Sequence, residues 1–464
     1  MLDFLNKKKV NNVHLVGIGG IAMSALAEIL LDKGYSVSGS DIRASHITTK
    51  LSNHGAKVYI GHHQDNITGA DIIVYTSAAN PDNPEIVKAS ELGIPILDRA
   101  EMTGELMLGY KTSVAVSGAH GKTTATSMIS LIFEHAQFNP TILVGGELSE
   151  IGGNVKVGGN DLMITEACEY KENFLKFHPN VGVVLNIDED HLDYFKDFEH
   201  IFSTFSKFAK LIPKKGYLVL NNDDYDVRKL ISHANCNIIT YGINLDSDFQ
   251  AKNITFSESG YPSFDVIHKG EILERFSLDI PGQHNIYNAL ASIATTYTLG
   301  VPIEQINEKL KKFKGTHRRF DILGEWNTVK VIDDYAHHPT EIKATLDAVQ
   351  KIPNNRIWCI FQPHTYTRTK SLLLDFGKSF DGADNIIIAD IYAAREKDTG
   401  EIHSKDLVEQ INKEGHNAVY IPSFESIVDH LKKHAAPKDI VLTMGAGNIY
   451  EVGNMLVEKA AKSS

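Results

Sequence analysis

Residues 118–124, Gly-Ala-His-Gly-Lys-Thr-Thr, form the segment whose residue types and spacing most clearly suit chemistry. They follow an apolar run at residues 112–116 and open a helix-like stretch that reaches about Glu134. In such a turn, backbone N–H groups cradle phosphates, a lysine reaches the β- and γ-oxygens, and a hydroxyl binds Mg²⁺. Val116 stands where the full GxxxxGK[ST] pattern has glycine, so the loop is a shortened variant. A plain glycine turn with a chance Lys-Thr pair is the alternative. The residues predicted to hold a nucleoside triphosphate are Gly118, Ala119, His120, Gly121, Lys122, Thr123 and Thr124.

Two further polar side chains follow apolar runs, Glu166 after residues 162–165 and His191 after residues 181–186. Ligands of a parallel sheet bind beyond the carboxyl ends of its strands, so both side chains should lie near the phosphate loop. Glu166 offers oxygen ligands suited to Mg²⁺, and His191 could hold a second Mg²⁺ or Mn²⁺. Alternatively, Glu166 is only a carboxylate at a helix N-terminus and His191 only caps its loop.

Residues 17–22 form a second glycine turn, GxGxxA, between an apolar run and a helix-like stretch at residues 21–31. Its glycines would let the backbone approach a pyrophosphate at the positive end of that helix. Asp41 ends the next predicted strand, where it could accept hydrogen bonds from ribose. A nicotinamide dinucleotide, a UDP-sugar and a plain tight turn all satisfy this pattern. Single polar residues nearby also suit ordinary loop positions, namely Ser40, His62 and Ser77.

The last third of the chain places charged residues at the ends of predicted strands. Asp334 and His337 follow one strand, and Arg368 follows another, where it could bind a carboxylate or a phosphate. Arg319 stands beside a predicted hinge. A moving domain could bring its charge onto a transferring phosphoryl group, although paired basic residues are usually surface features.

Residues 282–288, Gly-Gln-His-Asn-Ile-Tyr-Asn, precede an alanine-rich helix. The ring of His284 or the amide of Asn285 could stack on adenine or bind its edge. The simpler interpretation is that the segment only begins a helix.

Composition and charge exclude several classes of protein. The chain of 464 residues is 42% hydrophobic and 22% charged, as in soluble globular proteins, and its net charge is −12. That sign disfavours nucleic acid and anionic membranes as partners. The three cysteines lack CxxC spacing, which favours a reducing compartment. No apolar run approaches the roughly 18 residues of a membrane span, and the N-terminus lacks the apolar stretch of a signal peptide. We expect a cytoplasmic enzyme.

Short apolar runs alternate with helix-length stretches along most of the chain, which is typical of βαβ units and parallel sheets. We therefore predict an α/β fold of three domains, residues 1–110, 111–313 and 314–464. Residues 311–315, Lys-Lys-Phe-Lys-Gly, are expected to form a solvated hinge before the third domain.

In order, these motifs resemble those of the ATP-dependent Mur ligases of peptidoglycan synthesis. The resemblance covers nearly the whole chain and rests on HLVGIGGIAMSALAEIL, GSD, SGAHGKTT, EACEYKENF, NIDEDHLDYF, GQHNIYNAL, GTHRRFD, DDYAHHPTE, FQPHTYTRT and TMGAGNI. It implies a Rossmann-like N-terminal domain that binds a UDP-sugar and a central P-loop ATPase-type domain. A Rossmann-like C-terminal domain would close over the site.

The likeness is greatest to the alanine-adding members, which implies UDP-N-acetylmuramate and L-alanine as substrates and ATP with Mg²⁺, or Mn²⁺, as cofactors. ATP would convert the lactyl carboxylate to an acyl phosphate, which the amine of L-alanine attacks. The resemblance gives catalytic roles to Lys122, His191, Arg319 and His337, and metal binding to Thr123, Glu166 and His191. ATP would further contact His284, Asn285, Arg319 and Asp334. The substrates would contact Gly19, Ser40, Asp41, His62, Ser77, His120 and Arg368. A monomer and a homodimer both remain open.

Two departures limit the transfer of roles. Many relatives have Arg where this chain has Thr365, so one substrate contact is missing or replaced. Several related ligases carry a carbamylated lysine, but the alanine-adding members generally do not, and Lys207 is not assigned this modification.

Three other functions stay open at this stage. A dehydrogenase would use the first glycine turn, but it leaves Lys122, Glu166 and His191 unexplained. A sibling ligase that attaches a recycled murein tripeptide to the same UDP-sugar would share the scaffold. A non-enzymatic ATP-gated regulator would need no residues that activate a carboxylate.

Overall fold

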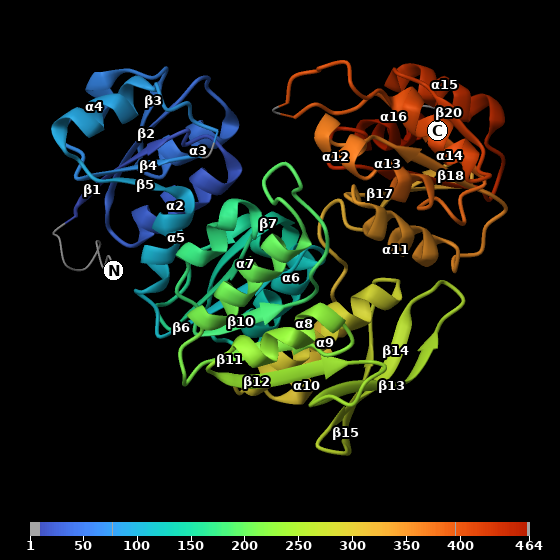
Figure 1. Cartoon of the computed structure of the whole chain (residues 1–464), viewed down its shortest axis with the longest axis horizontal. Coiled ribbons are helices and arrows are strands. Elements are labelled where there is room, and N and C mark those ends of the chain that lie inside the picture. Colours follow the sequence, from blue (N-terminus) through green and yellow to red (C-terminus); the bar gives the residue numbers. More distant parts are fainter. Residues whose placement is uncertain (1–9, 77, 395, 462–464) are drawn as a thin grey trace.

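The computed structural model describes residues 10–76, 78–394 and 396–461. Its strands form three separate sheets. In Figure 1 the N-terminal sheet lies at the upper left and the C-terminal sheet at the upper right, with the larger middle body below and between them. The predicted α/β class with three domains is confirmed. Along the described part of the chain, no helix combines the length and the apolar character that crossing a bilayer requires.

The N-terminal domain is built on a parallel five-stranded sheet in the order β3-β2-β1-β4-β5. The strand order reverses beside β1, and the predicted glycine turn begins there, at the carboxyl end of that strand. Gly17 has a φ of +81°, and a Cβ at this position would lie 2.6 Å from Cγ2 of Thr76, so only glycine fits. The elements are β1 (Asn12–Val16), α2 (Ile21–Asp32), β2 (Ser36–Asp41), α3 (His46–Asn53), β3 (Lys57–Ile60), a 3₁₀ helix (Gln64–Ile67), β4 (Ile72–Tyr75), α4 (Pro84–Leu92), β5 (Ile96–Asp98) and α5 (Arg99–Met107).

The middle domain holds ten strands in the order β15-β14-β13-β12-β11-β10-β6-β9-β7-β8. β6 lies between β9 and β10 and is parallel to both, so the carboxyl ends of these three strands meet at one edge, as predicted. The elements are β6 (Thr112–Ser117), α6 (Lys122–His135), β7 (Thr141–Leu148), β8 (Gly153–Lys156), β9 (Leu162–Glu166), β10 (Val181–Val184), α7 (Phe198–Leu211), β11 (Tyr217–Asn221), α8 (Tyr225–Lys229), β12 (Asn237–Gly242), β13 (Phe249–Phe256), β14 (Pro262–His268), β15 (Glu271–Ser277), α9 (Gln283–Thr298) and α10 (Ile303–Lys311), with 3₁₀ helices at Ser149–Ile151, Tyr170–Lys176 and Leu230–His233.

Both faces of the middle sheet are buried. Val183 and Val184, adjacent in β10, belong to two different apolar cores because successive side chains of a strand point to opposite faces. α6 and α9 pack together over the face of Val183, and α7 supplies Phe205 and Phe208 to the other. This double cover explains why the parallel strands are continuous apolar runs in the sequence.

The C-terminal domain has a six-stranded sheet in the order β16-β17-β21-β18-β19-β20, parallel except for β16. The elements are β16 (Asp321–Trp326), β17 (Val329–Asp334), α11 (Pro339–Val349), β18 (Ile357–Phe361), α12 (Tyr366–Ser371), α13 (Leu373–Gly377), β19 (Asn385–Ile388), α14 (Ser404–Lys413), β20 (Ala418–Tyr420), α15 (Phe424–His434), β21 (Ile440–Met444) and α16 (Tyr450–Ala461). The domain boundaries at residues 110 and 314 stay predictions; the first falls between α5 and β6, the second between α10 and β16.

The predicted solvated hinge is wrong for one residue. Phe313 is 1% exposed and packs in the middle-domain core, because its apolar ring gains more from burial than its exposed lysine neighbours do. Arg318, three residues after this segment, anchors the chain to the C-terminal domain. Its guanidinium donates to the carbonyls of Gly445 (2.6 Å) and Gly447 (2.9 Å) and lies over the rings of Tyr335 and Tyr450.

Candidate active site between the middle and C-terminal domains

The phosphate loop connects β6 to α6 through two glycines with positive φ. A Cβ on Gly121 (φ +82°) would lie 2.6 Å from Oδ1 of Asn288, and one on Gly118 (φ +144°) would lie 3.0 Å from Cβ of Leu185. No side chain caps the start of α6, so its first N–H groups are available to an anion. The loop therefore fits a bound phosphate.

Lys122 is held by its own loop and by Glu169. Its Nζ donates to the carbonyls of Gly118 and Ala119 and lies 3.0 Å and 3.2 Å from the two carboxylate oxygens of Glu169. Burial alone would lower the pKa of Lys122, but the charge of Glu169 raises it above its usual value. Glu169 is buried and was not singled out in the sequence, although it stands three residues after Glu166 in the same motif.

Thr123 and Glu166 share a neighbour in β7. Oε1 of Glu166 accepts the N–H of Gly145 at 2.6 Å. A Cβ on Gly145 would lie 2.8 Å from Oε2 of Glu166, and one on Gly146 would lie 3.2 Å from Cγ2 of Thr123. The two predicted ligands thus lie against the adjacent glycines of β7, Gly145 and Gly146. They offer hydroxyl and carboxylate oxygens, which are ligands that suit Mg²⁺.

His191 lies close to two carboxylates, those of Glu169 and Asp190. Its Nε2 is 3.8 Å from Oε1 of Glu169 and 3.8 Å from a carboxylate oxygen of Asp190, and its ring packs on Tyr170 with centroids 4.6 Å apart. Its backbone has a φ of +56°, unusual for histidine. One imidazole nitrogen beside two carboxylates is a donor set that suits a divalent cation such as Mn²⁺.

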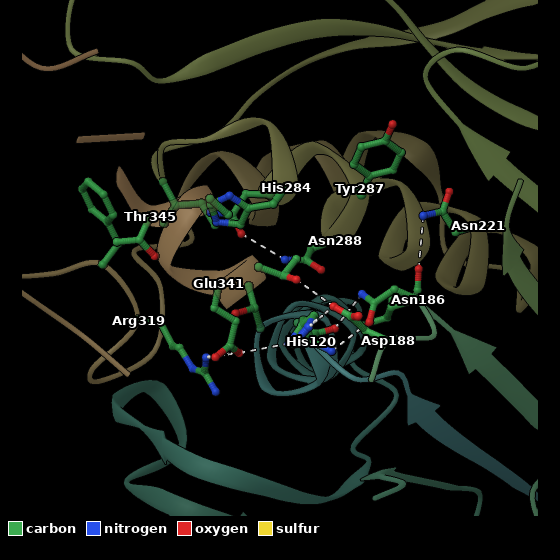
Figure 2. A pocket seen from close by; sticks show the side chains of 18 of the residues that line it. His120, Asn186, Asp188, Asn221, His284, Tyr287, Asn288, Arg319, Glu341 and Thr345 are labelled. Carbon is green, nitrogen blue, oxygen red and sulfur yellow. Dashed lines mark hydrogen bonds and ion pairs between the residues drawn. The ribbon is translucent and has the colours of Figure 1, made fainter. Parts of the chain in front are cut away.

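A cavity of about 300 Å³ lies between the middle and C-terminal domains (Figure 2). Both predicted adenine contacts, His284 and Asn285, line it from α9, and Arg319 and Asp334 line it from the C-terminal domain. Burial lowers the pKa of His284 to about 4, so its ring is neutral. Burial also raises the pKa of Asp334 to about 6, although its carboxylate accepts two backbone N–H groups.

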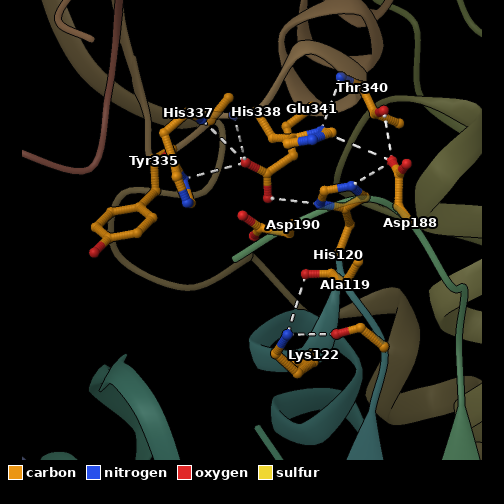
Figure 3. A network of polar contacts seen from close by, with 12 residues as sticks. Ala119, His120, Lys122, Asp188, Asp190, Tyr335, His337, His338, Thr340 and Glu341 are labelled. Atoms are coloured by element: carbon orange, nitrogen blue, oxygen red, sulfur yellow. Dashed lines mark hydrogen bonds and ion pairs between the residues drawn. The ribbon is translucent and has the colours of Figure 1, made fainter. Parts of the chain in front are cut away.

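His120 connects the phosphate loop to the C-terminal domain (Figure 3). Its Nε2 lies 2.9 Å from Oδ2 of Asp188, and its Nδ1 lies 3.4 Å from Oε1 of Glu341 in α11. Burial alone would lower the pKa of His120, but these two carboxylates raise it to about 9. Glu341 also lies 3.7 Å from Arg319 and 3.2 Å from Nδ1 of His337. The carboxylate of Glu341, which is 12% exposed, thus lies within 4 Å of three of the predicted site residues.

Comparison with known proteins decides the family. Three family models match in order: "Mur ligase family, catalytic domain" at residues 12–111, "Mur ligase middle domain" at residues 116–296 and "Mur ligase, glutamate ligase domain" at residues 318–447. The UDP-N-acetylmuramate–L-alanine ligase of Alkaliphilus metalliredigens is 57% identical over 98% of both chains. The enzyme of that name from Acetivibrio thermocellus is 55% identical, again over 98% of both. The chain belongs to the Mur ligase family.

Solved structures agree with this assignment. The crystal structure of UDP-N-acetylmuramate-alanine ligase MurC from Thermotoga maritima superimposes with a TM-score of 0.80 at 29% identity, covering 98% of this chain and 100% of that one. A murein peptide ligase from Psychrobacter arcticus shares the fold, with a TM-score of 0.70 at 24% identity over 96% and 98% of the two chains. The dehydrogenase and regulator alternatives are set aside, because the chain is a Mur ligase.

This Mur ligase has a second cavity, of about 460 Å³, which His191, His337, Thr365 and Arg368 line. Arg368 is already engaged there: its guanidinium donates to Oδ1 of Asp190 at 2.7 Å and 3.2 Å. Burial lowers the pKa of His337 to about 3, so its imidazole is neutral. The structure therefore brings together the predicted catalytic histidines and Arg368, with Asp190 as an additional member.

The candidates of the N-terminal domain of this Mur ligase form a separate group at the carboxyl end of its sheet. Asp41 accepts the N–H of Gly19 at 2.9 Å, so its carboxylate closes the glycine turn. Ser40 is fully buried and donates to Glu85 at 2.5 Å, and His62 lies 3.2 Å from the same carboxylate. Ser77 lies outside the described residues.

Two residues mark the departures from the family pattern. Thr365 has a φ of +67°, a strained conformation for a β-branched residue, and its hydroxyl caps α12. Lys207, on α7, is half exposed, and its Nζ lies 2.9 Å from a carboxylate oxygen of Glu172.

Several residues of the site are not predicted from the sequence, namely Glu85, Glu169, Asp188, Asp190 and Glu341. All but Glu85 stand inside motifs that carried the family resemblance, and Asp188 and Asp190 also follow the strand predicted at residues 181–186, as His191 does.

Proposed function

We propose that the chain joins L-alanine to the lactyl carboxylate of UDP-N-acetylmuramate at the expense of ATP, in the synthesis of peptidoglycan precursors. Relatives of that name, 53–57% identical over nearly their whole length, support this substrate pair. The observation that carries the proposal is a chain of contacts between the two cavities. His120 lines the first cavity, and Lys122 of the same loop reaches through Glu169 to His191 of the second.

We place ATP in the first cavity and the reacting carboxylate and amine in the second. The neutral ring of His284, which is partly exposed, and the amide of Asn285 would hold adenine. Lys122 would leave Glu169 for the phosphate oxygens, and Arg319 would approach them from the C-terminal domain. Thr123, Glu166 and His191 would hold the divalent cations, which when bound neutralise the phosphate charge.

The chemistry requires activation because a carboxylate is a poor electrophile. Its oxygen takes the γ-phosphoryl group of ATP, giving an acyl phosphate and ADP. The amine of L-alanine attacks the acyl carbon, the tetrahedral adduct collapses, and inorganic phosphate leaves as the amide forms. Arg368 is placed to bind a carboxylate once Asp190 releases it. The glycine turn closed by Asp41 would bind the UDP portion, and we assign the reaction to the cytoplasm.

A substrate panel tests the proposal. We expect inorganic phosphate release from ATP only when UDP-N-acetylmuramate and L-alanine are both present. Release that needs the murein tripeptide in place of L-alanine would overturn the assignment in favour of the sibling ligase. Lys122→Ala should fold and lose at least about 100-fold in turnover, because the lysine stabilises charge that develops on the transferring phosphate. Lys207→Ala, which removes an exposed lysine, is the matched control.

A further inference from the structure

We propose that His120, Asp188 and His338 form a binding site for a borderline divalent cation of the Zn²⁺ type, which ties the middle and C-terminal domains together. His120 belongs to the phosphate loop, Asp188 follows β10, and His338 is the N-cap of α11. One ligand atom from each residue lies within 4.8 Å of the other two. The proposed reaction assigns no role to His338 or to Asp188.

The spacing of the ligand atoms suits a tetrahedral ion. Oδ2 of Asp188 lies 2.9 Å from Nε2 of His120 and 3.8 Å from Nδ1 of His338. Two atoms bound to one tetrahedral Zn²⁺ at about 2.0–2.1 Å are themselves about 3.3 Å apart, so small side-chain rotations complete the geometry. Nδ1 of His338 now accepts the N–H of Thr340 at 3.3 Å, a long bond that the ion would replace.

The groups behind the three ligands are those that orient metal-binding side chains. The far nitrogen of each imidazole faces an oxygen: Nδ1 of His120 lies 3.4 Å from Glu341, and Nε2 of His338 lies 3.1 Å from the carbonyl of Glu189 (Figure 3). Thr340 donates its hydroxyl to Asp188 at 2.7 Å. With an ion bound, Nδ1 of His120 and Nε2 of His338 would keep their protons, which is the usual arrangement in metal sites. The proton that Nε2 of His120 now shares with Asp188 would be released as the ion binds.

The types of ligand atom distinguish this proposed site from the proposed magnesium site. Two imidazoles and one carboxylate favour Zn²⁺ or Co²⁺, whereas Mg²⁺ prefers oxygen ligands such as Thr123 and Glu166. His338 is 4% exposed, and the side chains of His120 and Asp188 are 13% and 32% exposed, so the ion would sit in a partly enclosed position between the domains. Because His120 and Asp188 line the first cavity, an ion here would hold that cavity closed.

Calorimetric titration of the full chain with Zn²⁺, in excess Mg²⁺, tests the site. The informative variant is His338→Asn, because asparagine keeps an N-cap acceptor and removes the imidazole. We expect one site in the native chain and at least about 100-fold weaker binding in the variant, since loss of even an outer-shell partner costs about 10- to 100-fold. His403→Asn, at the histidine N-cap of α14, is the matched control and should bind like the native chain.

Two outcomes would overturn the site. One is equal Zn²⁺ affinity in the His338→Asn variant and the native chain. The other is a thiolate-to-metal absorption band in the Co²⁺-loaded protein, which would put the ion on a cysteine. Hydrogen–deuterium exchange tests the link between domains: Zn²⁺ should slow exchange in the phosphate loop and at the start of α11, in the native chain and His403→Asn only. Unchanged exchange in the native chain would contradict the link, and neither readout depends on the ligase activity.

Discussion

Lys122 and Glu169 form an ion pair at the base of the phosphate loop, with Nζ 3.0 Å from Oε2 and the carboxylate almost fully buried. The lysine that is proposed to bind the triphosphate is therefore already neutralised in the nucleotide-free chain. Binding of ATP would exchange one set of anionic oxygens for another around the same cation.

Glu169→Gln tests this exchange. Without the carboxylate, Lys122 is a buried cation with weaker partners, which should cost about 3 kcal/mol of stability when no nucleotide is bound. Phosphate would restore the missing charge, so ADP should raise the melting temperature of the variant more than that of the native chain. Thermal unfolding with and without ADP measures both effects. Glu172→Gln removes a 28%-exposed partner of Lys207, so it should cost no more than about 1 kcal/mol of stability and should leave the ADP-induced shift unchanged. Equal ADP-induced shifts in Glu169→Gln and the native chain would contradict the exchange.

Gly121→Ala tests the shape of the phosphate loop. The new Cβ would lie 2.6 Å from the amide oxygen of Asn288, at a φ of +82°. Gly152→Ala is the matched control, because Gly152 has a φ of +72° with no atom within 4 Å of its added Cβ. Both variants should lose about 1–2 kcal/mol from backbone strain, but only Gly121→Ala should lose nucleotide affinity. Calorimetric titration with ADP measures it, and equal affinities would show that the contact with Asn288 is harmless.

Glu85→Gln tests the buried carboxylate beneath the N-terminal candidate site. Burial would raise the pKa of Glu85, but bonds from His14, Ser40 and Asn66 lower it to about 2. A folded pKa below the unfolded value near 4.5 stabilises the fold above pH 4.5, and this contribution fades as the pH falls toward 2. Between pH 5.5 and 3.5 the native chain should lose about 1.4 kcal/mol from this group.

The variant should be less stable at pH 5.5 and should lack this part of the acid sensitivity. Denaturant unfolding at the two pH values measures both. Glu91→Gln, at an exposed position of the same helix, should retain the native acid sensitivity. A variant at Glu85 that loses stability as steeply as the native chain would show that other groups govern the acid response.

Arg368→Lys tests the geometry of the second cavity. Arg368 donates through two nitrogens to Asp190, and a lysine keeps the charge but not the planar fork. We expect kcat/KM to fall at least about 10-fold, which corresponds to about 1.4 kcal/mol. Arg356→Lys weakens a similar pair with Asp439 away from both cavities and should leave kcat/KM unchanged. Steady-state phosphate release compares them, and equal values for the two variants would remove Arg368 from substrate binding.

Sequence reasoning was most successful where one motif and one sheet edge determine position. The GxxGKTT spacing located the phosphate loop, and the rule for parallel strands placed the ends of β6, β9 and β10 together. Contacts between domains had no comparable signal. Glu341 and His120 are separated by more than two hundred residues, and only the packing of the C-terminal domain brings them within 3.4 Å.

Burial was also hard to predict for polar side chains. Ser40 stands at a strand end, as a ligand contact would, yet its hydroxyl is used by Glu85 inside the domain. Phe313 stands among lysines, yet a single aromatic ring was enough to fix that segment to the core. In both cases the outcome depends on a tertiary neighbour that the local sequence does not reveal.

Arg318 has a consequence for how the C-terminal domain can turn. Because its guanidinium is fastened to Gly445, Gly447 and two aromatic rings, the chain from Arg318 onward moves as one piece with that sheet. If that domain rotates against the middle domain, the bending would fall in the few residues just before Arg318, around Gly315, whose φ is +94°. Arg319, which directly follows Arg318, would then move little in such a rotation.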